Sequence, residues 1–255
     1  EAQIKLIIKN QIKFINPKDF EDNLNFNEKE KKILLTIDDS FLSFYKNAWP
    51  FLKKNKIPFI LFVNTKEVGS FNYMNWKQIK EIAKEEFVHI GNHSHSHEYL
   101  IDKKPNEIRA DIKKSISILK NKIGYNTKFF SYPFGEYSLV FKKIVKELGF
   151  KYAFGQHSGV VTKNVDPLEL PRFPINEKYG EIERFKLITK TLPLNFIKIL
   201  PEEKYINIKN NPPEVLIEFD EDIKNLKRIN CYSNEGNKWK QSEIIFLNNN
   251  ILKVN

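Results

Sequence analysis

The amino-acid sequence predicts an α/β protein with a mainly parallel sheet and a small β-rich extension at its C-terminal end. Short apolar segments, rich in β-branched and aromatic residues, alternate with amphipathic helical patterns up to about residue 175. Polar motifs directly follow three of these segments. After Pro193 the helical patterns give way to closely spaced strand and turn signals.

Five apolar segments are short enough to be buried strands. They are residues 33–37, 58–63, 88–91, 129–132 and 151–154. Strands that alternate with helices are expected to pair in parallel, because a helical crossover brings each new strand back in the same direction. The number of repeats favours a barrel-like or doubly wound sheet.

Apolar residues at helical spacing predict the longest helix. Its single apolar stripe consists of Ile108, Ile112, Ile116, Leu119 and Ile123. Gly124 follows the stripe and is the residue type that most readily ends a helix in the left-handed conformation.

Two further helices are predicted from their end signals. Asn75 with Gln78 forms a capping-box pattern ahead of an apolar stripe. Ser138 is placed to cap a helix that Gly149 closes.

The C-terminal part is predicted to be rich in β-strands. Strand signals occur at residues 215–219, 228–232, 242–247 and 251–254, with turn signals at residues 234–236 and 248–250. We therefore expect three parts: an N-terminal segment of residues 1–30 that packs on the barrel, a main domain of residues 31–195, and a β-rich extension of residues 196–255.

Composition excludes several classes of protein. A hydrophobic fraction of 41% in 255 residues is ample for a packed core, and no run of 18 apolar residues predicts a membrane span. The single cysteine, Cys231, excludes an internal disulfide and a cysteine cluster for zinc. The net charge of +10 does not predict nucleic-acid binding, because basic and acidic residues are interleaved along the helical patterns.

Polar motifs follow three predicted strands at the point where each strand ends. Asp38 and Asp39 follow residues 33–37, His93 and His97 follow residues 88–91, and Pro133-Phe134-Gly135 follows residues 129–132. In parallel α/β folds, reactive residues gather beyond the carboxyl ends of the strands. The three motifs are therefore expected to meet.

The residue types in these motifs are those of a metal hydrolase. His93 and His97 are four residues apart, so a helical turn or tight loop turns both imidazoles to one side and His95 elsewhere. With Asp39 they form a set of ligands that zinc accepts, with a position left open for water. Neighbouring residues on an extended chain point in opposite directions, so Asp38 is expected to act separately, as the base that takes a proton from that water.

These motifs resemble those of the polysaccharide deacetylases, the NodB-homology group or carbohydrate esterase family four. Residues 36–40, Thr-Ile-Asp-Asp-Ser, resemble the first motif, and residues 93–97, His-Ser-His-Ser-His, match the second, His-Ser/Thr-x-x-His. Residues 131–135, Ser-Tyr-Pro-Phe-Gly, are similar to the third motif in the form seen in bacterial poly-N-acetylglucosamine deacetylases. The resemblance covers roughly residues 30 to 190.

The resemblance implies a distorted (β/α) barrel that removes acetyl groups from amino sugars of a polysaccharide or oligosaccharide. It implies that Asp38 is the general base and that Asp39, His93 and His97 hold a divalent metal, with zinc expected ahead of cobalt or nickel. The backbone N–H of Phe134 would help to bind the oxyanion.

Two positions depart from the family pattern. Phe130 stands where the family usually has an arginine that orients the catalytic base, and Arg172 is the candidate replacement. A structural salt bridge is the alternative interpretation of Arg172. The late Leu-x-His motif that supplies the general acid is missing, and His157 is the candidate for that role. The alternative interpretation of His157 is a loop histidine that forms a hydrogen bond with the backbone.

Two other functions stay open on the sequence alone. One is a non-catalytic glycan-binding protein that retains the pocket, which the two departures motivate. The other is an iron oxygenase with two histidines and one carboxylate, although that motif usually lies on a β jelly roll. Because the chain begins at Glu1 without an initiator methionine, a removed signal peptide is compatible with it, and an exported or periplasmic location is expected, with a cytoplasmic one left open. The sequence makes no prediction of the oligomeric state.

Overall fold

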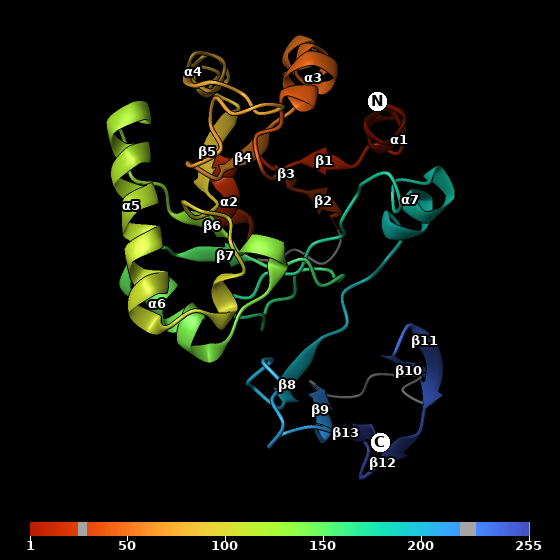
Figure 1. The fold of residues 1–255 in the computed structure, drawn as a ribbon. Helices are drawn as coiled ribbons and strands as arrows, with labels where there is room; N and C mark the ends of the chain where they lie inside the picture. The colour runs from red at the N-terminus through yellow and green to blue at the C-terminus, as the bar shows by residue number, and fades with distance from the viewer. Residues whose placement is uncertain (25–29, 220–227, 255) are drawn as a thin grey trace. The chain divides into compact units, whose positions relative to one another are not determined.

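A five-stranded parallel sheet forms the centre of the larger part of the protein (Figure 1). The computed structural model describes residues 1–24, 30–219 and 228–254, and the chain divides into unit 1, Glu1–Leu192, and unit 2, Pro193–Asn255. The sheet of unit 1 has its strands in chain order and all parallel: β3 (Leu35–Ile37), β4 (Phe59–Val63), β5 (Val88–Asn92), β6 (Phe129–Ser131) and β7 (Tyr152–Phe154). All five predicted strands are confirmed within one or two residues.

Helices return the chain between successive strands and lie along the outer side of the sheet (Figure 1). They are α3 (Trp49–Lys54), α4 (Trp76–Ala83), α5 (Pro105–Ile123) and α6 (Leu139–Glu147). The remaining elements of unit 1 are α1 (Ala2–Lys9), α2 (Phe20–Asn23), α7 (Ile182–Ile188), the paired strands β1 (Lys13–Phe14) and β2 (Lys32–Ile33), the 3₁₀ turns η1 (Pro17–Asp19), η3 (Leu100–Asp102) and η4 (Pro133–Gly135), and the π-helix η2 (Phe44–Ala48). Among the described residues, no helix combines the length and apolar character needed to cross a bilayer.

The sheet is curled rather than flat. Ser131 at the end of β6 donates a hydrogen bond of 3.3 Å to Asp38, which directly follows β3. In a flat sheet the three strand spacings between β3 and β6 would separate these residues by about 14 Å. The distorted (β/α) barrel predicted from the sequence is therefore confirmed, and its curl brings the ends of distant strands together.

Both faces of β4, which lies between β3 and β5 in the sheet, are buried, which explains its uninterrupted apolar sequence. Phe59, Leu61 and Val63 pack on the side covered by α3 and α4. Ile60 and Phe62 point to the inner side of the curl, where they meet a cluster of mainly aromatic side chains. This inner cluster also contains Phe20, Phe129, Tyr152, Phe154 and Leu170.

The predicted helix ends agree with the structure. The Asn75 side chain accepts a hydrogen bond from the Gln78 N–H at 3.0 Å, and the Gln78 side chain accepts one from the Asn75 N–H at 2.9 Å. Ser138 caps α6 by accepting the N–H of Phe141. Gly124 ends α5 with a φ of 93°, in the left-handed region that glycine adopts without strain.

The buried stripe of α5 differs from the predicted one, because Ile116 and Ile123 are only partly buried. Ile108, Ile112 and Leu119 are buried as expected, but the fourth buried residue is Ser115 rather than Ile116, which is only partly buried. The apolar periodicity could not show this, because the side chain that Ser115 meets is a polar residue of β5, Asn92.

Unit 2 consists of antiparallel strands. A four-stranded sheet has the order β12 (Ile244–Phe246), β13 (Ile251–Val254), β9 (Val215–Phe219) and β8 (Phe196–Leu200), and β10 (Cys231–Glu235) pairs with β11 (Lys238–Ser242) as a hairpin. The β-rich extension is therefore confirmed. The strand predicted at residues 228–232 is wrong in its first part, because β10 begins only at Cys231. The preceding residues 220–227 lie outside the described part of the chain.

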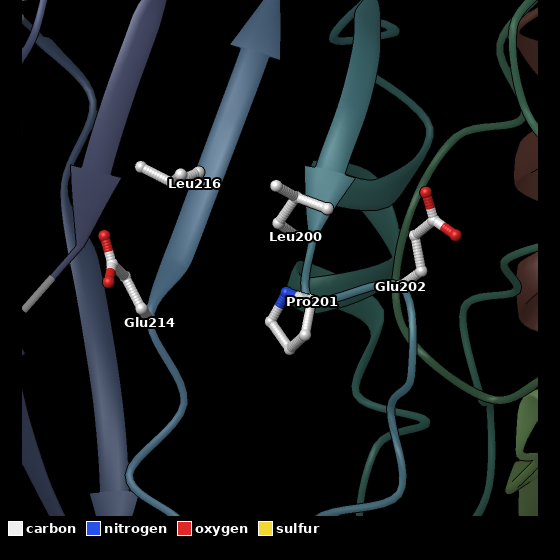
Figure 2. A pocket seen from close by; sticks show the side chains of 5 residues that line it. All are labelled: Leu200, Pro201, Glu202, Glu214 and Leu216. Carbon is white, nitrogen blue, oxygen red and sulfur yellow. The ribbon is translucent and has the colours of Figure 1, made fainter. Parts of the chain in front are cut away.

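The core of unit 2 is small. Phe219 and Leu252 are its fully buried residues among those described. At one end of β8 and β9 a shallow pocket opens to solvent, and its lining is mixed in character (Figure 2). The lining residues are Leu200, Pro201, Glu202, Glu214 and Leu216. None of them belongs to the motifs that the sequence predicts to be functional.

Gly91 of β5 sits against the ring of Phe62 on the inner side of the curl. A β carbon on Gly91 would lie 2.3 Å from a ring carbon of Phe62. We expect Gly91→Ala to lower the free energy of unfolding by about 1–3 kcal/mol, because overpacking forces β4 and β5 apart. Calorimetry should show a Tm lower by several degrees. An unchanged Tm would mean that Phe62 moves aside without cost.

Candidate active site

The two aspartates that follow β3 lie in a tight left-handed turn. Asp39 has a φ of 70° and Ser40 a φ of 57°, a region that aspartate tolerates better than most residues. The prediction that the neighbouring carboxylates take different partners agrees with the contacts of Asp38 and Asp39. The reason given for this prediction was wrong, because Asp39 has a left-handed conformation and does not continue an extended chain from Asp38.

Asp39 meets the two predicted histidines. Its Oδ1 lies 3.4 Å from Nε2 of His93 and 3.2 Å from Nε2 of His97, and one ligand atom from each of the three residues falls within 4.8 Å of the others. His93 is almost fully buried at the end of β5, and its Nδ1 donates a hydrogen bond to the carbonyl of Ser131 at 2.7 Å. That bond places the proton of a neutral ring on Nδ1 and directs the Nε2 lone pair at Asp39.

The arrangement fits a divalent cation. Oδ1 of Asp39 is buried and, among the described residues, accepts no hydrogen bond. With neutral rings, an orphaned carboxylate oxygen therefore faces nitrogen lone pairs, and a cation between them removes this conflict. Two imidazole nitrogens and one carboxylate oxygen are ligands that zinc and similar transition metals accept.

The carboxylates of Asp38 and Asp39 make the surroundings of the histidines negative. Burial opposes protonation of His93, but the two aspartates and the carbonyl of Ser131 outweigh it and raise the pKa of His93 above its ordinary 6.5. At His97, burial and the charge of His93 lower the pKa, and the aspartates offset only part of that effect. Of the two rings, His93 therefore holds a proton to the higher pH.

Asp38 is paired with Arg172. Nη1 and Nη2 of the guanidinium lie 2.8 Å from Oδ1 and Oδ2 of Asp38, a bidentate geometry. Removal from water would by itself raise the pKa of Asp38, but the charge of Arg172 outweighs it, helped by His93 and by hydrogen bonds, and holds the pKa at about 2. Asp38 is therefore an anion at neutral pH.

The guanidinium of Arg172 is held from several sides. It donates to the carbonyl of Gly155 at 2.7 Å and to the hydroxyls of Thr36 and Ser131 at 3.1 and 3.0 Å. Its centre lies 5.9 Å from the ring centres of both Phe62 and Phe154. These contacts leave the guanidinium little freedom, so it fixes the orientation of the carboxylate that it binds.

Phe134 and His157 lie after the ends of two other strands, β6 and β7. Phe134 lies in η4 with a φ of 59°, and its ring centre is 4.8 Å from that of His97. His157 is exposed after β7, with its ring 6.1 Å from that of Tyr137, and its carbonyl accepts the N–H of Arg172. The oxyanion role of Phe134 and the acid role of His157 stay predictions.

Ser131 contributes to the site in a way that sequence reasoning missed. Ser131 was noted only as part of a motif, yet its carbonyl orients His93 and its hydroxyl contacts Asp38 and Arg172. A serine inside an apolar strand segment was the available signal, because a polar residue in a buried strand needs a hydrogen-bond partner.

Comparison with known proteins identifies the family. Residues 26–153 match the family model described as polysaccharide deacetylase. The chain belongs to the polysaccharide deacetylase family. The resemblance found in the three motifs is thus confirmed over half of the chain.

Named relatives and solved structures agree with this assignment. The chain is 29% identical over 194 residues to poly-β-1,6-N-acetyl-D-glucosamine N-deacetylase of Staphylococcus aureus, a match that covers 69% of this chain and 66% of that relative. The Staphylococcus epidermidis protein of the same name is 28% identical over 193 residues, with 69% and 66% covered. Less than two thirds of either relative is therefore represented.

Two solved structures share the fold of the chain. The deacetylase PplD of Streptococcus pyogenes, in complex with acetate, has a TM-score of 0.68 at 25% identity and covers 74% of this chain and 85% of its own. IcaB from Ammonifex degensii has a TM-score of 0.66 at 25% identity and covers 74% and 87%. Each match covers 74% of the chain, about 189 residues, and unit 2 has 63 residues, so at least about two thirds of the matched residues lie in unit 1.

The pKa shifts predict how metal affinity depends on pH. A proton on Nε2 of His93 must leave before that nitrogen binds a metal, so affinity should be highest above the raised pKa of His93. Below that pKa we expect affinity to fall about tenfold per pH unit, and more steeply once His97 is also protonated. Titration of zinc against a chromophoric chelator between pH 8 and 5 measures this. A pH-independent affinity would contradict the assignment of the ligands.

Replacement of Arg172 by methionine should remove the ion pair that orients the carboxylate of Asp38. Without the guanidinium, only His93 and the Ser131 hydroxyl still oppose the effect of burial on Asp38, so its pKa should rise from about 2. The acidic limb of the pH–rate profile should then move to higher pH, and the rate at pH 7 should fall roughly 100-fold because the carboxylate is no longer oriented. Arg184→Met is the control, since Arg184 donates to the carbonyls of Pro174 and Tyr179, lies over the Tyr179 ring and pairs with neither aspartate among the described residues. Equal profiles for both variants would refute the pairing as a functional one.

Proposed function

We propose that the protein hydrolyses the N-acetyl groups of amino sugars in a polysaccharide, with a divalent metal held by Asp39, His93 and His97. One observation carries the proposal: the two neighbouring carboxylates have separate partners. Asp39 faces two imidazoles, while Asp38 is bound to Arg172 beside them. This separation leaves one acid for a metal and one for proton transfer. The family and the names of the relatives support the reaction and the class of substrate.

Asp38 is the proposed general base. With a pKa of about 2 it is ionised at neutral pH and can accept a proton from an attacking water, although such a weak base requires an acidified water. When bound, a divalent cation would supply that acidity, because coordination lowers the pKa of water to about 7. Arg172 holds the Asp38 carboxylate in one orientation throughout.

Phe134 and His157 complete the proposed reaction. Attack on the acetamide places negative charge on its oxygen, and a backbone N–H aimed at that oxygen stabilises it. We assign this N–H to Phe134, whose ring neighbours that of His97. We assign protonation of the departing amine to His157, which is exposed next to Tyr137 and therefore accessible to a substrate.

The alternative function, a non-catalytic glycan-binding protein, now has less support than it had from the sequence alone. It rested on two departures from the family pattern, and Arg172 supplies the cation that Phe130 cannot. The proposal of an iron oxygenase has no support from the fold, because the parallel sheet of unit 1 is not a jelly roll. The choice of zinc over cobalt or nickel and an exported or periplasmic location remain our predictions.

Release of acetate from poly-N-acetylglucosamine and from chitooligosaccharides tests the proposal. We expect Asp38→Asn to retain one bound metal and to lose about 10²- to 10⁴-fold in rate, because the proton acceptor is removed. His93→Ala should lose both the metal and the activity, because it removes one of three ligands. Metal content by elemental analysis and acetate by an enzyme-coupled assay are the measurements.

Two results would count against the proposal. Undiminished activity in Asp38→Asn would remove the base, and a wild-type protein that binds metal and glycan without releasing acetate would favour the non-catalytic alternative.

A further inference from the structure

The loop that carries both histidines adopts a conformation that its own residues disfavour. Ser94 has a φ of 65° and His97 a φ of 53°, and neither is a glycine. A left-handed conformation costs an ordinary residue roughly 1–2 kcal/mol, so contacts from elsewhere must hold the loop in place. The question is which residues supply those contacts.

Part of the support comes from the sheet. The N–H of His93 donates to the carbonyl of Val63 at 3.1 Å, and the carbonyl of His95 accepts the N–H of Lys66 at 2.9 Å. The segment that follows β4 therefore holds one side of the loop. The N–H groups of His95 and Ser96 point to the other side and need acceptors of their own.

The carboxylate of Asp111 in α5 provides both acceptors. Oδ1 accepts the N–H of His95 at 2.7 Å, and Oδ2 accepts the N–H of Ser96 at 3.0 Å. Hydrogen bonds from backbone N–H groups to a charged carboxylate are stronger than those between neutral groups. Asp111 thus binds the backbone of the segment that lies between His93 and His97.

A second residue on the same face of α5 holds the start of the loop. Ser115, four residues after Asp111, is fully buried, and its hydroxyl lies 2.9 Å from Oδ1 of Asn92. That oxygen also accepts the N–H of Ser94 at 2.9 Å. The placement of Ser115 in the buried stripe of α5, where an apolar residue was expected, follows from this contact.

We propose that Asp111 is a positioning residue for the metal site, which sets the distance between the two histidine ligands through the backbone that joins them. The inference rests on the metal site of the proposed function. Asp111 itself is placed against backbone N–H groups rather than against a ligand atom, so it acts through the loop. Only a carboxylate offers one acceptor oxygen to each of the two N–H groups, since an amide would turn its own donor toward one of them.

Metal affinity and geometry in Asp111→Asn test the proposal. We expect zinc affinity, measured against a chromophoric chelator at pH 8, to fall about 10- to 100-fold, the usual cost of losing a group that orients a metal ligand. The visible absorption of the cobalt-substituted protein should change, because the ligand positions relax. Asp111→Glu keeps two acceptor oxygens and should recover part of the affinity.

Controls separate this role from general stability. Lys113→Ala alters an exposed residue of the same helix and should leave affinity and spectrum unchanged. Asp111→Ala removes the carboxylate while favouring the helix and leaving room for water, so it serves if Asp111→Asn does not fold. Wild-type zinc affinity and an unaltered cobalt spectrum in the folded variant would overturn the proposal.

Amide hydrogen exchange makes the test independent of the proposed function. In metal-free protein the N–H groups of His95 and Ser96 should exchange much faster in Asp111→Asn than in the wild type, while β4 stays protected. Equal protection would overturn the anchoring role. If the exchange changes but the wild type binds no metal, the anchor stands and the metal site of the proposed function fails.

Discussion

The partial burial of two neighbouring carboxylates at the end of β3 is the constraint on which the site depends. A buried carboxylate without a partner costs several kcal/mol, so Asp38 and Asp39 each require positive charge or hydrogen-bond donors. Asp38 has the guanidinium of Arg172. Asp39 has only two imidazoles, and Oδ1 is left without a donor among the described residues. The same requirement thus accounts for the observed ion pair and for the proposed cation.

The alternation of side chains along β6 explains why the cation for Asp38 comes from a distant segment. Phe129 and Ser131 belong to the inner side of the curled sheet, where Ser131 reaches Asp38. Phe130 points to the opposite side and is buried in the core formed with α5 and α6. An arginine at position 130 of this strand would enter that apolar core, whereas Arg172 enters the inner side after β7.

The supports of the loop that carries His93 and His97 show how far the candidate site extends beyond these two side chains. His93 and His97 are brought to one point by a loop in an unfavourable conformation, and the sheet on one side and α5 on the other stabilise it. Held from both sides, the two histidines would need little rearrangement to bind the proposed cation, and such preorganisation raises affinity. The helix therefore contributes to the site as well as to the core.

Local sequence patterns predicted much of the fold. The five strands of the barrel, the cap residues Asn75 and Ser138 and the end of α5 at Gly124 were readable because each depends on residues only a few positions apart. Strands β8 and β11 of unit 2 were not predicted. The residues of β11 are themselves mostly polar and exposed, so the strand has little periodic apolar signal.

The sequence alone determined which groups are available: two carboxylates after one strand, a pair of histidines after another, and Arg172 as a possible cation. The tertiary structure determined which of these groups contact one another. The left-handed turn at Asp39 and the curl that joins β3 to β6 assign one acid to the histidines and the other to an arginine 134 positions away. It also recruited Asp111 and Ser115, which no motif marked. The physical reason is that hydrogen-bond partners are chosen by distance in space, and the curl of the sheet sets those distances.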